Sequence, residues 1–343
     1  MKKYLIPESG KFYKANLHAH STVSDGKQTP EEIKALFSSL GYSIVAYTDH
    51  GVFIPHNDLT DESFLALNGV ELCVGHIDPA NVDWRQQKVC DIGMIALDAD
   101  IVNQPVWHRQ KYKGCGVTDE TRALAKFDES LPDYERVYSP EGISEMMRMG
   151  REKGFFVIHN HPTGSMELYP DYIGYQNLHA MEMYNYDSIR EGILEYNALK
   201  YEDCLRAGKR IYCVYTDDSH FADASGFGWV MIKAERLDYP TIAKALLEGN
   251  FYSSSGPEIT SLWYEDKKVH ITFPKAAKVI FYTDTGRRAM LMAPGGDPTA
   301  WGEAEFSLVG FEKWVRVTVY DERGNTADTN GYFLDELDEC FQR

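Results

Sequence analysis

The chain has 343 residues, of which 43% are hydrophobic and 25% are charged, and its formal net charge at pH 7 is −17. This composition is ordinary for a globular protein, and the acidic balance without a basic stripe excludes a protein that follows a long nucleic-acid backbone. The N-terminus lacks the apolar core of a secretory signal, and no apolar run approaches the roughly 18 residues of a membrane span. The six cysteines form no C-x-x-C pair, which is typical of reduced thiols, so we expect a cytoplasmic protein.

Apolar runs of strand length alternate with helical patterns through the first 250 residues. A helix is predicted from Thr29, its N-cap, to Leu40, with Gly41 as its stop. Strands are expected over 15–18, 44–48, 69–74, 93–97, 155–159, 180–184 and 211–216, and two further helices over 139–154 and 188–207. This alternation predicts an α/β fold with a largely parallel sheet.

Two segments depart from that pattern. Residues 101–138 fit neither a strand nor a long helix, so we interpret them as an insertion with a short helix, placed over the strand ends. After about residue 250 the apolar residues alternate with period two, for example in "KKVHITF", which predicts an antiparallel β domain. We therefore expect one domain over 1–250 and a smaller one over 251–343.

Histidines and carboxylates occur at or near the ends of the predicted strands. Each has an ordinary explanation by itself: Asp25 fits a turn, Asp49 a strand cap, and Glu71 a salt bridge within its apolar strand. Together they form a nitrogen and oxygen ligand set without thiolate, which suits Zn, Mn or Fe. The set comprises His18, His20, Asp25, His50, Glu71, His76, His161, Asp218 and His220.

The order of these motifs resembles the PHP family, the polymerase and histidinol phosphatase superfamily. The family's H-x-H, S-D-G, T-D-H, G-x-E, H-P and D-x-H elements appear here in sequence between about residues 14 and 225. The resemblance implies a distorted (β/α)7 barrel, two or three divalent metal ions and hydrolysis of phosphoesters. Two positions depart from the family: His159 is an extra histidine, and Asp217 replaces the usual serine.

The resemblance also implies how the ligands are shared. One metal would be held by His18, His20, Glu71 and Asp218, and a second would be served by Asp25, His50 and His220. A third would take Glu71 as a bridge, together with His76 and His161.

Residues that could serve the substrate are less clearly marked. His56, His108 and His159 are candidates for the general acid that protonates the leaving group. His108, Arg109, Lys111 and Lys113 form a basic run that is either a solvated loop or a phosphate clamp.

The predicted activity is hydrolysis of a small phosphorylated metabolite or nucleotide by a metal-bridged hydroxide, with bound cations offsetting the acidity of the chain. The alternatives are a monoesterase like histidinol phosphatase, or a non-catalytic metal-bearing interaction module. The C-terminal region resembles the small β-sandwich of some PHP phosphoesterases, and we expect it to stabilise the fold or an oligomer. The oligomeric state is left open.

Overall fold

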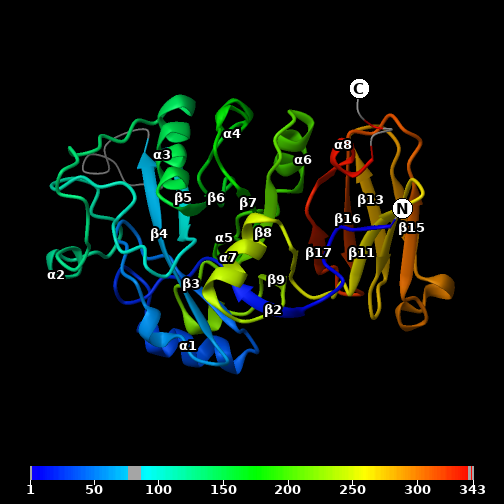
Figure 1. Ribbon diagram of the computed structural model, residues 1–343, viewed down its shortest axis with the longest axis horizontal. Coiled ribbons are helices and arrows are strands. Elements are labelled where there is room, and N and C mark those ends of the chain that lie inside the picture. The colour runs from blue at the N-terminus through cyan, green and yellow to red at the C-terminus, as the bar shows by residue number, and fades with distance from the viewer. Residues whose placement is uncertain (1, 76–85, 339–340, 342–343) are drawn as a thin grey trace.

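The computed structural model describes residues 2–75, 86–338 and 341, and it is a mixed α/β structure (Figure 1). A large sheet runs across the molecule in the order β14-β13-β16-β17-β10-β9-β2-β3-β4-β5-β6-β7-β8, with β18 paired to β16. A second sheet, of order β1-β11-β12-β15, lies with the C-terminal strands. Among the described residues, no helix combines the length and apolar character needed to cross a membrane.

The first half of the large sheet carries the strands that the apolar runs predict. They are β2 (Lys11–Asn16), β3 (Ile44–Tyr47), β4 (Leu65–Gly75), β5 (Val89–Ala96), β6 (Phe155–Asn160), β7 (Ala180–Asn185) and β8 (Tyr212–Thr216). Strands β2, β3 and β4 are parallel, as are β6, β7 and β8, but β5 pairs antiparallel with both β4 and β6. The sheet is therefore mixed, and the prediction of a largely parallel sheet is wrong at β5.

The strands that follow extend the same sheet. They are β9 (Trp229–Ala234), β10 (Phe251–Ser254), β13 (Lys278–Thr283), β14 (Ala289–Met292), β16 (Trp314–Tyr320), β17 (Thr326–Thr329) and β18 (Tyr332–Phe333). Their pairings are all antiparallel, as the alternating pattern after residue 250 predicts. Strand β10 pairs with β9, so hydrogen bonds cross the predicted boundary at residue 250, and the division into two domains stays a prediction.

The second sheet joins the start of the chain to its C-terminal region. It consists of β1 (Lys3–Tyr4), β11 (Ser261–Glu265), β12 (Lys268–Thr272) and β15 (Glu303–Ser307), all paired antiparallel. Its apolar face and that of the large sheet share one core, in which Leu262 and Ile271 meet Val279 and Val317.

The predicted barrel is not confirmed, because the sheet is not closed in the part of the chain that the structure describes. The segments that follow its strands β2 and β8 nevertheless meet. Ala19 and Ser219 form an isolated parallel bridge, and the backbone N–H of His20 donates to the carbonyl of Ser219 at 2.9 Å. This meeting brings two of the ligand-bearing segments together.

Helix signals read from the sequence are confirmed at two helices, α1 (Pro30–Ser39) and α3 (Pro140–Glu152). In α1, Thr29 and Glu32 form a capping box, and Gly41 follows the helix with a φ of 79°. The remaining helices are α2 (Asp119–Arg122), α4 (Tyr169–Gly174), α5 (Tyr186–Arg190), α6 (Ala198–Arg206), α7 (Tyr239–Leu247) and α8 (Leu334–Leu337), with short 3₁₀ turns at Asn57–Leu59, Ala222–Ala224, Pro294–Gly296 and Pro298–Ala300. Helices α3, α4 and α6 stand in a row along the sheet (Figure 1).

The predicted helix over 188–207 is wrong, because the chain breaks it into α5 and α6. Gly192 leaves the helical region with a φ of 92°. The segment then turns Glu195 inward, where its buried carboxylate accepts hydrogen bonds from the backbone N–H groups of Thr163 and Gly164. A buried carboxylate with two backbone donors stabilises this loop against the helix that the local pattern favours.

Candidate metal centre

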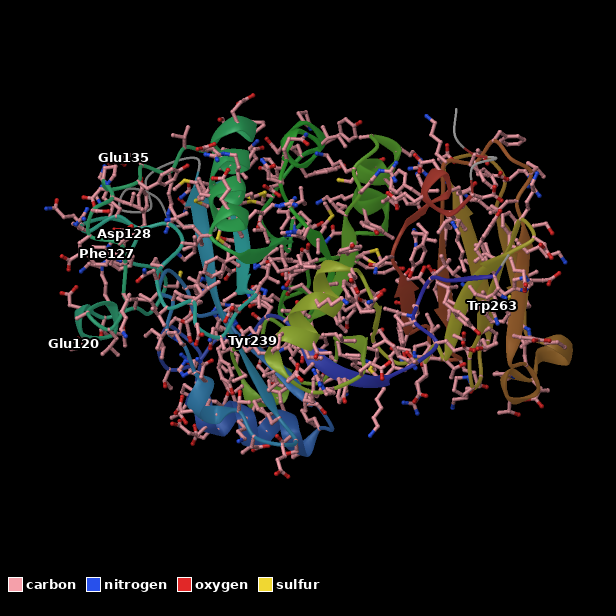
Figure 2. The ribbon with its side chains drawn as sticks, in the orientation of Figure 1. Glu120, Phe127, Asp128, Glu135, Tyr239 and Trp263 are labelled. Carbon is pink, nitrogen blue, oxygen red and sulfur yellow. The ribbon has the colours of Figure 1, made fainter. Side chains whose placement is uncertain are left out.

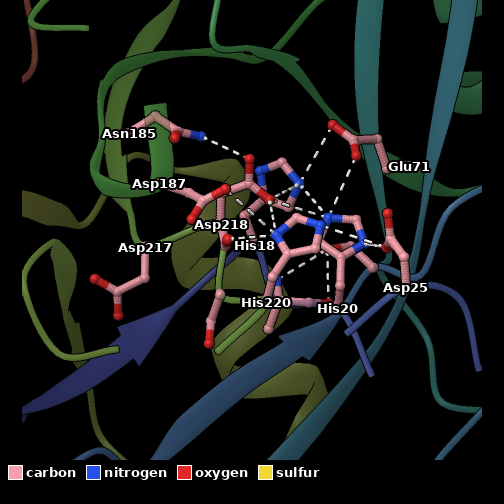
Figure 3. A network of polar contacts seen from close by, with 12 residues as sticks. His18, His20, Asp25, Glu71, Asn185, Asp187, Asp217, Asp218 and His220 are labelled. Carbon is pink, nitrogen blue, oxygen red and sulfur yellow. Dashed lines mark hydrogen bonds and ion pairs between the residues drawn. The ribbon is translucent and has the colours of Figure 1, made fainter. Parts of the chain in front are cut away.

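His18 and His20 lie just beyond β2, one residue on either side of the bridge at Ala19. Both side chains are buried, and their Nε2 atoms are 3.0 Å apart. The Nε2 atoms also lie 3.2 Å and 3.0 Å from one carboxylate oxygen of Asp218. The two imidazoles therefore converge on one point, as the H-x-H spacing predicts (Figure 3).

Glu71 is a buried carboxylate in the middle of β4, and it lies between several imidazoles. Its Oε1 is 3.3 Å from His18 Nε2 and 3.1 Å from His161 Nε2. Its Oε2 is 3.4 Å from His20 Nε2 and 3.0 Å from His50 Nδ1. Glu71 therefore lies within 3.4 Å of four imidazoles, and its role as a bridge between metal ions stays a prediction.

The side chains of Asp25, His50 and His220 form the other half of the cluster together with His20. Asp25 lies 3.7 Å from His50 Nε2 and 3.4 Å from His220 Nε2. One potential ligand atom from each of these four residues lies within 4.8 Å of the others, and the same holds for three smaller groups of this cluster. Those groups are His18 with Glu71 and His161, His18 with His20 and Asp218, and Asp187 with Asp218 and His220.

A second layer of polar side chains orients these groups. Glu182, buried in β7 (Ala180–Asn185), accepts from His18 Nδ1 at 2.7 Å and from the backbone N–H of His161 at 2.9 Å. Asn185 donates to both Glu182 and Asp218, and Asn160 donates to Glu71 at 2.7 Å. The bond to Glu182 uses His18 Nδ1 and so leaves Nε2 directed into the cluster. The two amide bonds use Glu71 Oε1 and Asp218 Oδ2, and they leave Glu71 Oε2 and Asp218 Oδ1 without a donor from the described part of the chain.

Two aspartates next to the ligands hold loops instead. Asp49 accepts from the backbone N–H and hydroxyl groups of Ser21 and Ser24, so it fixes the turn that carries Asp25. Asp217 accepts from the backbone N–H groups of residues 226–228, and burial raises its pKa to about 6. Both therefore fix the loops of the metal centre.

The electrostatics of the cluster favour a bound positive charge. Burial alone would lower the pKa of His18, but the charges of Asp218 and Glu71 outweigh it and raise the pKa well above its ordinary value. Burial alone would also lower the pKa of His20, but its hydrogen bonds to Asp218 and Glu71 outweigh burial and raise that pKa to about 10.

Buried polar atoms without hydrogen-bond partners also favour a bound cation. Among the described residues, His20 Nδ1, Glu71 Oε2 and Asp218 Oδ1 are buried and have no hydrogen-bond partner, and so is Asp25 Oδ1. A buried acceptor without a partner costs about 1–3 kcal/mol, more if it is charged. Bound divalent cations would satisfy these oxygens, so the residues present fit the metal ions that the family resemblance implies.

His56 and the first residues of the basic run have partners outside this cluster. His56 packs against the ring of Tyr47 at 4.9 Å, and burial lowers its pKa. Arg109 is held within the insertion by Asp133 at 2.7 Å, and His108 pairs with Glu135 at 3.1 Å. In this conformation the guanidinium of Arg109 is occupied, which favours the solvated loop over the phosphate clamp.

His159 lies on the opposite face of β6 from the ligands. Its Nε2 is 2.5 Å from Glu167, which also accepts from the hydroxyl of Tyr175 at 2.5 Å, and Cys90 completes a buried group. The neighbouring ligand His161 reaches the cluster because it has a φ of 24°, which breaks the alternation that would give both histidines one face. His159 is therefore not positioned to protonate a leaving group at the cluster.

The remaining residues are one predicted ligand and three acidic side chains that were not predicted. His76 falls within 76–85, outside the described residues. The sequence analysis missed Glu182, Asp91 and Asp187. Asp91 lies 3.9 Å from His161 Nδ1, and Asp187 lies 3.7 Å from His220 Nδ1. Glu182 and Asp91 interrupt apolar strands just as Glu71 does, so the same signal could have found them.

The insertion touches the cluster through glycines. An added Cβ at Gly116 would lie 2.3 Å from the carbonyl oxygen of Ser24 and 2.8 Å from the Cα of Asp25, and one at Gly114 would lie 2.6 Å from the carbonyl oxygen of His50. Backbone therefore packs on backbone at two ligand-bearing loops, and only glycine allows this approach. Residues Phe127 and Glu135 mark the rest of the insertion at one end of the molecule (Figure 2).

Comparison with known proteins gives partial matches. No family model matches the chain. An uncharacterized protein of Methanocaldococcus jannaschii is 26% identical over 112 residues, which is 28% of this chain and 50% of the relative, so the match spans about half of that relative's length.

Three solved structures are similar at low identity. A two-domain protein of Bacteroides vulgatus, described as containing a predicted PHP-like metal-dependent phosphoesterase, gives a TM-score of 0.46 at 14% identity, covering 96% of this chain and 98% of that one. PsfC from Pseudomonas syringae gives 0.40 at 13% identity, covering 69% and 88%. A putative metal-dependent phosphoesterase from Bifidobacterium adolescentis gives 0.37 at 14% identity, covering 71% and 96%.

Proposed function

We propose that this chain is a metal-dependent phosphoesterase of the PHP family that acts on a small phosphorylated metabolite or nucleotide. The observation that carries the proposal is the convergence of His18, His20, Glu71 and Asp218, which come from three separate segments, around buried oxygens without hydrogen-bond partners. Imidazole and carboxylate ligands suit Zn, Mn or Fe, and when bound such ions stabilise phosphoryl charge and lower the pKa of water.

The protein's own groups then have distinct tasks. Glu71 and Asp218 supply the negative charge that holds the cations, while Glu182 fixes the His18 tautomer by accepting from Nδ1, so that Nε2 can act as a ligand. Asp187, 3.7 Å from His220 and half-exposed, is a better placed candidate for a proton donor or acceptor than His56, His108 or His159. Burial and the charge of Asp218 raise the pKa of Asp187 above its ordinary value.

The test is hydrolysis of p-nitrophenyl phosphate and bis-p-nitrophenyl phosphate by wild type and Asp218→Ala, with Mn²⁺ added. We expect wild type to hydrolyse at least one ester, and Asp218→Ala to lose about 10³-fold in kcat/KM or more, since it removes a group that contacts both central imidazoles.

Glu167→Gln is the matched control, because it removes a buried carboxylate paired with a histidine on the other face of β6. It should keep the activity. Equal activity of Asp218→Ala and wild type would contradict the proposal. A wild type that binds metal but leaves both esters intact would favour the non-catalytic module.

A further inference from the structure

Two cationic side chains from different segments meet at one aromatic ring beside the metal centre. Lys27 follows Asp25 by two residues, and Arg190 ends α5. The Lys27 ammonium lies 5.9 Å from the centre of the Phe221 ring, and the Arg190 guanidinium carbon lies 4.7 Å from it. Phe221 directly follows the ligand His220, so this group, here called the rim cluster, adjoins the metal centre.

The present partners of the two cations tie them to the ligands. Lys27 donates to the backbone carbonyl of Asp25 at 3.1 Å, and its own backbone N–H donates to the carbonyl of His220 at 2.9 Å. Arg190 pairs with Asp187 at 3.2 Å, and Asp187 lies 3.7 Å from His220 Nδ1 (Figure 3). Each cation is thus one contact away from a metal-ligating side chain.

Both cations remain open to solvent. Lys27 is exposed, and the Arg190 side chain is 37% exposed. An exposed ion pair such as Arg190 with Asp187 contributes little to stability, so an incoming anion can compete for the guanidinium. The guanidinium offers five donors, of which Asp187 engages only part, and can bind a carboxylate or phosphate through two of them.

The strongly acidic character of the chain gives the two cations of the rim cluster a possible role in binding an anion. With a net charge of −17 and carboxylates throughout the metal centre, an anionic substrate meets repulsion except where cations are held. The bound metal ions would serve the reacting phosphate. A second anionic group on the same substrate needs its own positive partner, and the rim cluster provides two next to an aromatic face.

We propose that Lys27, Arg190 and Phe221 form a binding subsite for a second anionic group, carboxylate or phosphate, on a ring-bearing phosphoester. The ring of the substrate lies against Phe221, and the second anion is held by Arg190 and Lys27 while the first is held at the metal centre. This inference rests on the proposed function for the position of the reacting phosphate.

Binding of two non-hydrolysable analogues tests the subsite without requiring turnover. Phenylphosphonate and 4-carboxyphenylphosphonate differ only in the second anion, and their affinities for the full chain with Mn²⁺ are measured by isothermal titration calorimetry. We expect wild type to bind the carboxylated analogue about tenfold more tightly, as for one charge-assisted hydrogen-bonded pair. Arg190→Gln should bring the ratio close to one, Lys27→Gln should lower it about threefold, and Arg190→Lys should retain part of it.

Arg148→Gln is the matched control, because Arg148 is also an exposed helical arginine paired with a carboxylate three residues earlier. It should leave the ratio unchanged. Equal affinity of wild type for the two analogues, no binding of the carboxylated one, or a ratio unaffected by Arg190→Gln overturns the subsite.

Repeating the titrations with 1,4-benzenediphosphonate, in which a second phosphonate replaces the carboxylate, separates a carboxylate preference from a phosphate preference. Hydrolysis of p-nitrophenyl phosphate is followed on the same preparations. Hydrolysis of the ester without discrimination between the analogues would contradict the subsite alone. Discrimination between the analogues without hydrolysis would contradict the proposed function alone.

Discussion

Two buried charged networks of this protein differ in where their positive charge comes from. In the network at the junction of α6 and the C-terminal strands, Arg316 pairs with Glu202 at 2.6 Å and with Asp328 at 2.9 Å, and all three side chains are almost fully buried. Tyr196, Tyr215 and Thr318 donate to Asp328, so its oxygens are satisfied. In the metal centre, Glu71 and Asp218 each retain a buried oxygen without a hydrogen-bond partner.

The source of positive charge distinguishes a network that stabilises the fold from one that could bind a cation. Where the chain supplies an arginine, the buried carboxylates are paired and the network holds the fold together, although Arg316 Nε is buried without a hydrogen-bond partner among the described residues. Where it supplies only imidazoles and carboxylates, the folded state is left with uncompensated acceptors, which is costly unless a cation enters. The second network is therefore the proposed binding site.

The largest predicted effect comes from breaking the network around Arg316. Arg316→Met leaves Asp328 buried without a cation and removes one partner of Glu202, which keeps Arg206 at 2.6 Å, so the free energy of unfolding should fall by about 3–5 kcal/mol. Urea denaturation measures it. A loss below about 1 kcal/mol would show that Arg316 is not essential to that network. It would contradict the view that this network stabilises the fold.

Removing metal should act on the other network and leave this one intact. Since an ion bound at 100 times its Kd stabilises the folded state by about 2.7 kcal/mol, chelation should lower the free energy of unfolding by about that amount. Arg316→Met should cost the same with and without chelator, because the two networks share no partner. Unfolding curves that coincide with EDTA and with Mn²⁺ would contradict the account.

A smaller effect is predicted where the insertion contacts the ligand loops. Gly116→Ala places a Cβ against Ser24 and Asp25, so it should displace Asp25 and weaken metal binding by about 1–2 kcal/mol, measured by metal titration. Gly208→Ala is the control, since its φ of 83° carries the same backbone strain with nothing within 4 Å of the added atom. If both variants bind metal alike, the glycine contact does not position Asp25.

The smallest effect concerns the partly buried His179, whose Nδ1 accepts a hydrogen bond from the backbone N–H of Val157 at 2.9 Å. Burial lowers the pKa of His179 to about 4, whereas an unfolded histidine titrates near 6.5. Below pH 6.5, His179 therefore binds a proton in the unfolded chain but stays neutral in the folded chain until the pH approaches 4. The free energy of unfolding falls over this range as the pH falls. His179→Gln should lose about 1 kcal/mol less than wild type between pH 7 and pH 5 in urea denaturation performed with EDTA. Parallel losses in the two proteins would refute this.

Much of the fold could be predicted because continuous apolar runs mark buried strands. The runs ending near His50 and His161 correspond to β3 and β6, and the caps Thr29 and Ser139 begin α1 and α3. The direction of β5 could not be predicted, since "VCDIGMIA" reads the same for a parallel or an antiparallel strand. The break at Gly192 depends on the tertiary hydrogen bonds of Glu195, which no local pattern contains.

The site divides in the same way. His18 and His20 were predictable because a two-residue spacing on extended backbone gives one face. His159 was misplaced as a substrate residue because that rule puts it beside His161, and the left-handed backbone of His161 reverses the facing. Glu182 was missed although it interrupts the apolar run "AMEMYN" as Glu71 interrupts "GVELCV". Buried carboxylates in apolar strands are the signal to search for.

The most direct test is the metal content of the purified full chain after exposure to Mn²⁺, Zn²⁺ or Fe²⁺, measured by inductively coupled plasma mass spectrometry. The account predicts two or three equivalents in wild type, a marked loss in Glu71→Gln because that carboxylate faces four imidazoles, and no loss in Glu312→Gln, which removes a buried carboxylate paired with Arg287. A wild type that retains less than one equivalent, or a Glu71→Gln variant that retains as much as wild type, would contradict it.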